Sequence, residues 1–90
     1  MREIFEQTRF RKDLKRIKKS GKYQIQDLIA IVRALSEDEE LAPRHRDHSL
    51  GGEWKDFRDC HIKPDWLLLY KLEPAKLILV RTGSHSELFK

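Results

Sequence analysis

The sequence predicts an α+β fold in which a helical hairpin near the N-terminus packs on one face of an antiparallel sheet of about four strands. Residues 8–36 carry apolar side chains at three- and four-residue spacing, which is typical of amphipathic helices. Residues 54–80 instead contain three apolar segments separated by short turns, which is typical of strands joined in a meander. Helices followed by a run of strands favour the α+β class.

The helical part is expected to follow a short strand at Ile4–Phe5. Thr8 can cap the first helix, and Gly21 is expected to end it. A second helix should end near Ser36, and the acidic run at 37–40 is expected in a loop or a capped turn, because negative charge is unfavourable at a helix C-terminus. The apolar stripes of the two helices should face the sheet and comprise Phe10, Leu14, Ile17, Ile25, Leu28, Ile29, Val32 and Leu35.

The strands of the meander are expected at Trp54–Ile62, Trp66–Tyr70 and Leu77–Val80. Trp66–Tyr70 is apolar on both sides, so this strand should be central and covered on both faces. The connections near Pro64–Asp65 and 73–75 are too short for crossovers, so neighbouring strands should be antiparallel. A short terminal helix or turn is expected at Ser84–Phe89.

The length and the cysteine content limit what the chain can be. Its 90 residues are expected to form one domain, residues 1–90, with one modest core. Cys60 is the one cysteine, so an intramolecular disulfide and a cysteine-rich zinc site are excluded. We expect Cys60 to be an ordinary buried strand residue. No apolar run reaches the length of a signal peptide or of a membrane span, which favours a cytoplasmic protein without membrane contact.

The formal net charge is +4 and the isoelectric point is about 9.4, which favours binding to a polyanion. The segment 9–22 is dense in lysine and arginine and contains Asp13 as its one acidic residue. This basic helix is either an ordinary solvated surface or a surface that follows phosphates.

Three histidines lie at the ends of predicted elements: His48 before the sheet, His61 near the end of a strand and His85 after the last strand. In an antiparallel meander these positions and Asp65 can converge at one edge. RNA cleavage without a metal needs a base, an acid and cations that stabilise the crowded phosphorane. Histidine suits the acid and base roles because its ordinary pKa is about 6.5. The candidate cations for phosphate binding are Lys55, Arg58, Lys63 and Arg81.

Simpler interpretations of the same residues stay open at this point. A histidine in a small basic protein is commonly a surface or capping residue, and histidine with aspartate can also bind zinc. However, no pair here has the close spacing of a helical metal motif. Trp54, Phe57 and Trp66 are more typical of a core or sheet surface than of base stacking. Phe89 is either a final core residue or a free ring that stacks on a base.

Two segments resemble the YafQ branch of the RelE/ParE toxin superfamily. The first is His48–Lys71, with the motifs W-K and R-D-x-H-I-x-P-D-W, and the second is Arg81–Phe89, with R-x-G-[ST]-H-x-x-L-F. The motifs occur in the family's order and cover about half of the chain closely, whereas the helical hairpin matches in pattern only. The resemblance implies a RelE fold like that of microbial ribonucleases, and a type II toxin that cleaves messenger RNA on the translating ribosome.

The resemblance also implies the site. The family's functional positions fall on His48, His61, Asp65, His85 and Phe89; Trp66 matches a position near the site, and Arg81 matches a basic residue on the sheet. We expect His85 to be the general acid and either Asp65 or His48 to be the base. His61 and Arg81 should hold the phosphate, and Phe89 should stack on a base. No metal or cofactor is expected.

The partners implied are ribosome-bound messenger RNA and a cognate antitoxin, a small RelB- or DinJ-like protein. The basic surface suits both of them. Two alternatives stay open: a non-enzymatic module that binds RNA or ribosomes, and a ParE-like toxin directed at gyrase. The gyrase-directed branch generally lacks this set of histidines, which argues against the second alternative.

Overall fold

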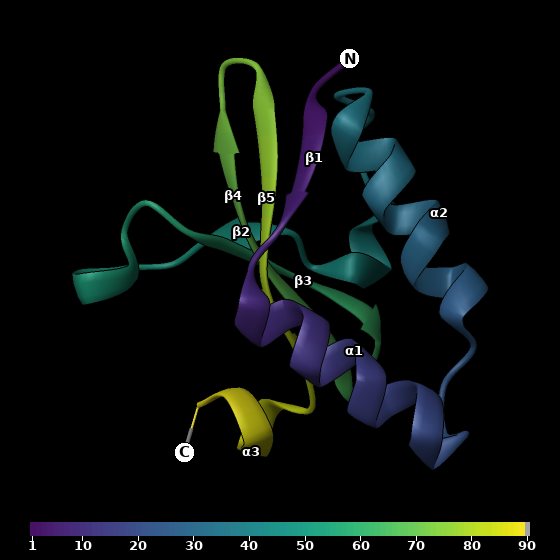
Figure 1. Ribbon diagram of the computed structural model, residues 1–90. Coiled ribbons are helices and arrows are strands. Elements are labelled where there is room, and N and C mark those ends of the chain that lie inside the picture. Colours follow the sequence, from purple (N-terminus) through teal and green to yellow (C-terminus); the bar gives the residue numbers. More distant parts are fainter. Residues whose placement is uncertain (90) are drawn as a thin grey trace.

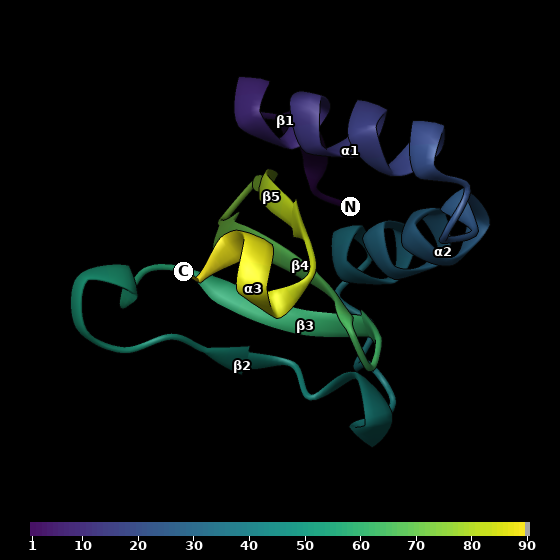
Figure 2. The same ribbon diagram turned by 90° about the horizontal axis from the view of Figure 1, so that it is seen from below.

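The computed structural model describes residues 1–89 and contains one five-stranded sheet with the strand order β1-β5-β4-β3-β2. The strands are β1 (Glu3–Glu6), β2 (His48–Ser49), β3 (Arg58–Lys63), β4 (Trp66–Glu73) and β5 (Lys76–Gly83). The helices are α1 (Thr8–Ser20), α2 (Ile25–Ser36) and α3 (His85–Leu88), with 3-10 turns at Pro43–His45 and Gly52–Trp54. Figures 1 and 2 show α1 and α2 together beside the twisted sheet, and α3 at the end of β5, away from α2.

The expected class is confirmed, with five strands in place of about four, but the expectation that every strand pair is antiparallel is wrong. β1 pairs in parallel with β5, from Glu3 opposite Lys76 to Glu6 opposite Leu79. The chain leaves β1 through both helices before it enters the meander, and this long connection lets the last strand return parallel to the first. The fifth strand, β2, has two residues, which is too short to produce a periodic pattern.

β3 begins at Arg58 and not at Trp54 as expected. Gly52 has a φ of 61°, a left-handed conformation that favours glycine, and it starts a 3-10 turn. The amide of Phe57 then donates to the carbonyl of Trp54 at 2.8 Å. These local hydrogen bonds use backbone groups that a strand would need for pairing, so residues 52–57 form a loop.

The two long helices end where the sequence predicts, but the expected cap of α1 is wrong. Gln7, and not Thr8, precedes the first helical residue, and within residues 1–89 its side chain makes no capping hydrogen bond. The acidic run after Ser36 lies in a turn and the segment that follows it, as expected. None of the helices in the described chain is long and apolar enough to cross a membrane.

The core lies mainly between the sheet and the helical hairpin. β4 is central, and its residues Trp66 to Tyr70 are at most 2% exposed. Trp66, Leu68 and Tyr70 belong to the cluster that packs against the helices, whereas Leu67 and Leu69 point to the opposite face by strand alternation. The prediction that this strand is covered on both faces is therefore confirmed.

Candidate active site

A buried carboxylate, Asp59 of β3, lies next to His48. β2 pairs with β3 so that His48 is directly opposite Asp59, and the Nδ1 of His48 is 3.3 Å from the Asp59 Oδ1. His61 lies two residues further along β3, on the same face of the strand. Burial raises the pKa of Asp59, and the charges of His48, His61 and His85 all act to lower it. His48 therefore lies beside this carboxylate, and His61 and His85 are near enough for their charges to act on it.

Asp59 is 5% exposed, and its Oδ1 has no hydrogen-bond partner among residues 1–89. The N–H of His48 does not supply one, because this group is engaged by the carbonyl of Arg46 at 2.6 Å. Buried polar groups are almost always hydrogen-bonded in folded proteins. A buried carboxyl with a raised pKa is a candidate functional group.

Backbone carbonyls fix the protonation pattern of two imidazoles. His48 Nδ1 is 2.6 Å from the carbonyl oxygen of Arg46, and His61 Nδ1 is 3.2 Å from that of Pro64. A carbonyl oxygen only accepts hydrogen bonds, so both Nδ1 atoms carry the hydrogen. In the neutral rings the Nε2 atoms then hold a lone pair, which makes each of these residues a suitable proton acceptor.

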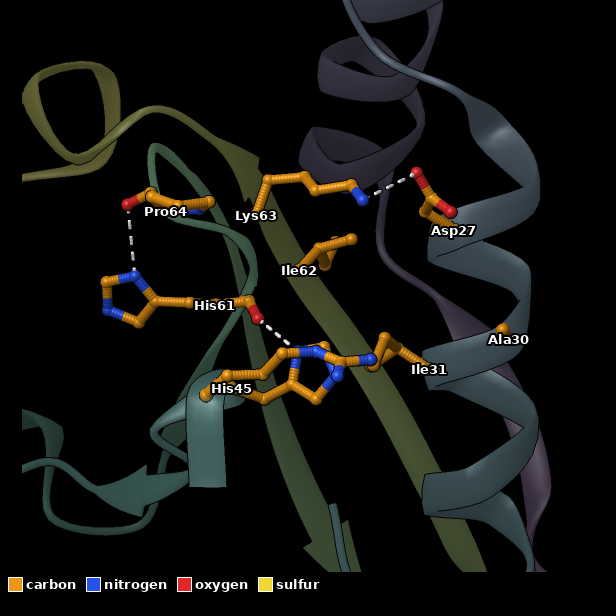
Figure 3. A pocket seen from close by; sticks show the side chains of 9 residues that line it. Asp27, Ala30, Ile31, His45, His61, Ile62, Lys63 and Pro64 are labelled. Carbon is orange, nitrogen blue, oxygen red and sulfur yellow. Dashed lines mark hydrogen bonds and ion pairs between the residues drawn. The ribbon is translucent and has the colours of Figure 1, made fainter. Parts of the chain in front are cut away.

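The fourth histidine, His45, holds the strand in place. Its Nδ1 donates to the backbone carbonyl of His61 at 2.6 Å. Figure 3 shows this contact beside a hollow of about 340 Å³ between α2 and the end of β3. The ring of His61 extends in the opposite direction, toward the carbonyl of Pro64. The ring of His61 is therefore directed away from this hollow.

Asp65 lies in the β3–β4 turn, and its surroundings differ from those of Asp59. Its carboxylate is exposed and lies 4.0 Å from the Nζ of Lys22, and its backbone carbonyl accepts a hydrogen bond from the hydroxyl of Tyr23 at 2.9 Å. The ring of Tyr23 stacks on Trp66 at 4.5 Å between centroids. Through Tyr23, the loop between α1 and α2 thus packs against the β3–β4 turn. Asp65 shares a second hollow, of about 440 Å³, with side chains of α3.

The C-terminal turn carries His85 and Phe89. Ser84 caps α3 through a reciprocal capping box with Glu87. The rings of His85 and Phe89 are 5.2 Å apart at an interplanar angle of 48°. Phe89 is half-buried, so it is neither a core residue nor a free ring, and its position depends on the same short helix as that of His85.

Most of the expected phosphate-binding cations are engaged elsewhere. Arg81 forms a bidentate pair with Asp13, Arg58 contacts Asp47 and the hydroxyl of Tyr70, and Lys63 is 3.5 Å from Asp27. Lys55 is exposed in the loop before β3. Trp66 is fully buried and its Nε1 donates to Thr82 at 2.8 Å, so its expected contact with RNA does not agree with its position.

Two residues of this region, Asp59 and His45, were not predicted from the sequence as site residues. One sequence feature could have identified Asp59 as part of the site: it lies two residues before His61, and alternate residues of a strand share a face. No sequence pattern identifies His45, because its hydrogen bond depends on how a 3-10 turn meets the end of β3. Among the residues that the structure describes, no cluster of three or more histidine, cysteine or acidic side chains is arranged to hold a metal ion.

A twisted sheet with a helical hairpin beside it and histidines on β2, β3 and α3 is the arrangement expected for the toxin family that the sequence motifs resemble. The chain belongs to the YafQ family: residues 2–90 match the family model described as "Bacterial toxin of type II toxin-antitoxin system, YafQ". The predicted resemblance is thereby confirmed.

Individual relatives are similar over nearly the whole chain. The mRNA interferase toxin YafQ of Escherichia coli K12 is 35% identical over 88 residues, which cover 98% of this chain and 96% of that protein. A metal-bound toxin from Helicobacter pylori is 46% identical, with a TM-score of 0.92 over 99% of this chain and all of the other. The toxin in a crystal structure of the E. coli DinJ–YafQ complex is 35% identical, with a TM-score of 0.90 over the full length of both chains.

Proposed function

We propose that this protein is a metal-independent endoribonuclease that cleaves ribosome-associated messenger RNA and thereby inhibits translation. The observation that carries the proposal is the placement of His48 opposite the buried Asp59, with His61 on the same face of β3. The charge of His85 on α3 also acts on Asp59. Two of these rings hold their hydrogen on Nδ1 and leave Nε2 to accept a proton. The names of the E. coli relatives, which describe mRNA interferases, support the same activity.

The reaction begins with attack of the ribose 2′-oxygen on the adjacent phosphorus. His48 Nε2 takes the 2′-hydroxyl proton as the 2′-O–P bond forms, and His85 gives a proton to the 5′-oxygen as the P–O5′ bond breaks. The products are a 2′,3′-cyclic phosphate and a 5′-hydroxyl. Asp65 was the other expected base, but its carboxylate lies beside the ammonium group of Lys22, so the geometry favours His48.

Binding residues surround the acid and the base. His61 lies on the same strand face as Asp59 and can donate to a phosphate oxygen when its ring is protonated. Phe89 packs against His85 and can stack on the base beside the cleaved bond. Arg81 is tied to Asp13, so we assign its main role to holding β5 against α1 rather than to binding phosphate.

The proposed partners are the ribosome with its message and a cognate antitoxin. Solved complexes of E. coli YafQ with DinJ support an antitoxin of that kind. The net charge of +4 suits an acidic antitoxin as well as ribosomal RNA. Because the substrate is messenger RNA under translation, we place the protein in the cytoplasm.

Cleavage of a defined message on purified ribosomes tests the proposal. The wild-type protein should cut the message equally well with and without EDTA, a control that matters because a solved H. pylori relative is metal-bound. A message with a single 2′-deoxy nucleotide at the cut site should not be cleaved, because it lacks the nucleophile. Cleavage of the deoxy message at the normal rate would refute the mechanism.

Growth inhibition in cells separates the proposal from a non-enzymatic module that binds through basic α1. We expect His85→Ala to relieve the growth arrest while the protein still binds ribosomes. If His85→Ala remains toxic and charge reversal on α1 abolishes toxicity, binding alone explains the effect.

A further inference from the structure

A chain of ion pairs connects α1 to α3. The Nε and Nη2 of Arg81 donate to the two carboxylate oxygens of Asp13 at 2.8 and 3.0 Å. The Nη1 of Arg16, one turn further along α1, donates to the same carboxylate at 3.1 Å. The Nε of Arg16 lies 3.2 Å from the Oε2 of Glu87 on α3. Arg16 therefore joins a buried carboxylate on its own helix to an exposed carboxylate on the C-terminal turn.

Glu87 uses its other oxygen to close the first turn of α3. Its Oε1 accepts a hydrogen bond from the Ser84 amide at 2.8 Å, and the Ser84 hydroxyl accepts one from the Glu87 amide at 3.3 Å. α3 has four residues, a length at which a helix is not stable without tertiary contacts. The ion pair with Arg16 is one such tertiary contact. It holds α3 at Glu87, which lies midway between His85 and Phe89.

The absence of a side chain at Gly83 makes room for the ion pair between Arg16 and Glu87. A Cβ at Gly83 would lie 3.0 Å from the Oε1 of Glu87 and 3.1 Å from the Nη2 of Arg16. Glycine therefore lets both charged groups approach the end of β5 closely. The chain passes directly from this point into Ser84 and His85, so the ion pair lies against the segment that sets the position of the imidazole.

We propose that Arg16 and Glu87 are positioning residues that hold His85 and Phe89 in place relative to the scissile phosphate. The inference rests on the proposed function, in which His85 is the general acid. Both partners are partly exposed, at 46% and 42%, and such pairs contribute little to global stability. Catalysis is more sensitive, because a displacement of about 1 Å can cost a large factor in rate.

Two substitutions remove the ion pair and keep the cap. Glu87→Gln retains an oxygen that accepts from the Ser84 amide, because glutamine also serves in capping boxes, but it removes the charge. Arg16→Gln removes the other charge. We expect each variant to lower the single-turnover cleavage rate on ribosomes about tenfold, with an unchanged half-saturating ribosome concentration. The melting temperature should shift by less than about 5 °C.

The two effects should also depend on each other. The double variant Arg16→Gln/Glu87→Gln should cleave no more slowly than either single variant, because the interaction is lost after the first change. Arg16→Lys preserves the charge and should recover most of the rate. Glu6→Gln is the matched control, because it removes an exposed carboxylate that lies 3.7 Å from Arg11 without touching α3, and it should cleave at the wild-type rate.

Three outcomes would overturn the inference. In the first, Glu87→Gln and Arg16→Gln both cleave at the wild-type rate while His85→Ala is inactive, which leaves the proposed function intact. In the second, Arg16→Gln raises the half-saturating concentration and Glu87→Gln has no effect, which makes Arg16 a direct RNA contact. In the third, His85→Ala itself cleaves at the wild-type rate, which removes the assignment of His85 as the general acid as well.

Discussion

Asp13 and Asp59 are buried to nearly the same degree, 3% and 5% exposed, but their surroundings are opposite. Asp13 accepts hydrogen bonds from Arg81, Arg16 and the amide of Thr82. Asp59 has three histidines nearby and an Oδ1 without a hydrogen bond among residues 1–89. Burial by itself would raise the pKa of both carboxyls. For Asp13 the hydrogen bonds from Arg81 and Thr82 outweigh burial and lower the pKa, whereas that of Asp59 stays raised.

The difference shows which of the two carboxylates stabilises the fold. The partners of Asp13 tie α1 to β5, so its charge is compensated where it is buried. Desolvation disfavours the charged form of Asp59, which lies beside His48 of the candidate site. An uncompensated buried group is a cost to stability that folds tolerate mainly at functional sites.

The largest effect is expected at Asp13. Asp13→Asn leaves the guanidinium of Arg81 partly buried without its carboxylate, so we expect a loss of about 3 kcal/mol in the free energy of unfolding. Urea denaturation measures it. The double variant Asp13→Leu/Arg81→Met removes both charges and should recover part of the loss. A loss below about 1 kcal/mol in Asp13→Asn would mean that the pair is not a structural clamp.

Asp59→Asn should have the opposite effect on stability. The substitution removes a carboxyl whose charged form is disfavoured by burial, so we expect the free energy of unfolding at pH 7 to rise by about 1 kcal/mol. Cleavage should nevertheless fall about tenfold or more, because the proposed base His48 loses the carboxylate beside it. A variant that is both destabilised and fully active would reverse the comparison.

The pH dependence of stability should separate the two carboxyls in sign. The pKa of Asp13 is lowered in the folded protein, so its contribution is present above the ordinary aspartate value of about 3.9 and is lost as the pH falls through the folded value. The pKa of Asp59 is raised, so its favourable contribution is present below about 3.9 and is lost as the pH rises through the folded value.

Melting curves of the two variants from pH 3 to pH 8 test this sign difference. Relative to wild type, the stability gain of Asp59→Asn should grow with rising pH, and the loss of Asp13→Asn should grow in the same direction. Equal and pH-independent shifts in both variants would contradict the assignment of the two pKa directions.

The smallest effect is expected at His45. His45→Phe removes the hydrogen bond to the carbonyl of His61 but keeps a ring in the 3-10 turn, so we expect a loss of about 1 kcal/mol in stability. Cleavage should fall about threefold, because the hydrogen bond orients the strand and not the reacting atoms. The measurements are thermal unfolding and single-turnover cleavage. A loss of activity as large as that of His85→Ala would place His45 in the site itself.

Periodicity predicted the parts of the fold that bury one apolar face. The apolar stripes between Phe10 and Leu35 correctly predicted both long helices, and the run Trp66–Tyr70, apolar on both sides, correctly predicted the central strand. β2 and the parallel pairing of β1 could not be predicted in this way, because two residues carry no period and pairing depends on the path of the whole chain. The loop at 52–57 was missed because Gly52 and its local hydrogen bonds override the apolar pattern.

The candidate site could likewise be predicted only in part from the sequence. The residue types and motifs identified the histidines, but they could not show which charges already have partners. The sequence predicted that Arg81 binds phosphate, but in the fold its guanidinium is paired with Asp13. Asp59 was expected to be an ordinary strand residue, and it comes next to His48 only because β2 pairs with β3 in the fold.

The pH dependence of the single-turnover cleavage rate on ribosomes tests most directly whether the histidines around Asp59 act as acid and base. The wild-type profile should be bell-shaped. His48→Ala should be slow and should lose the acidic limb, because the base whose protonation produces that limb is gone, and His85→Ala should lose the alkaline limb. Profiles that keep both limbs in both variants would show that neither imidazole transfers a proton in the reaction.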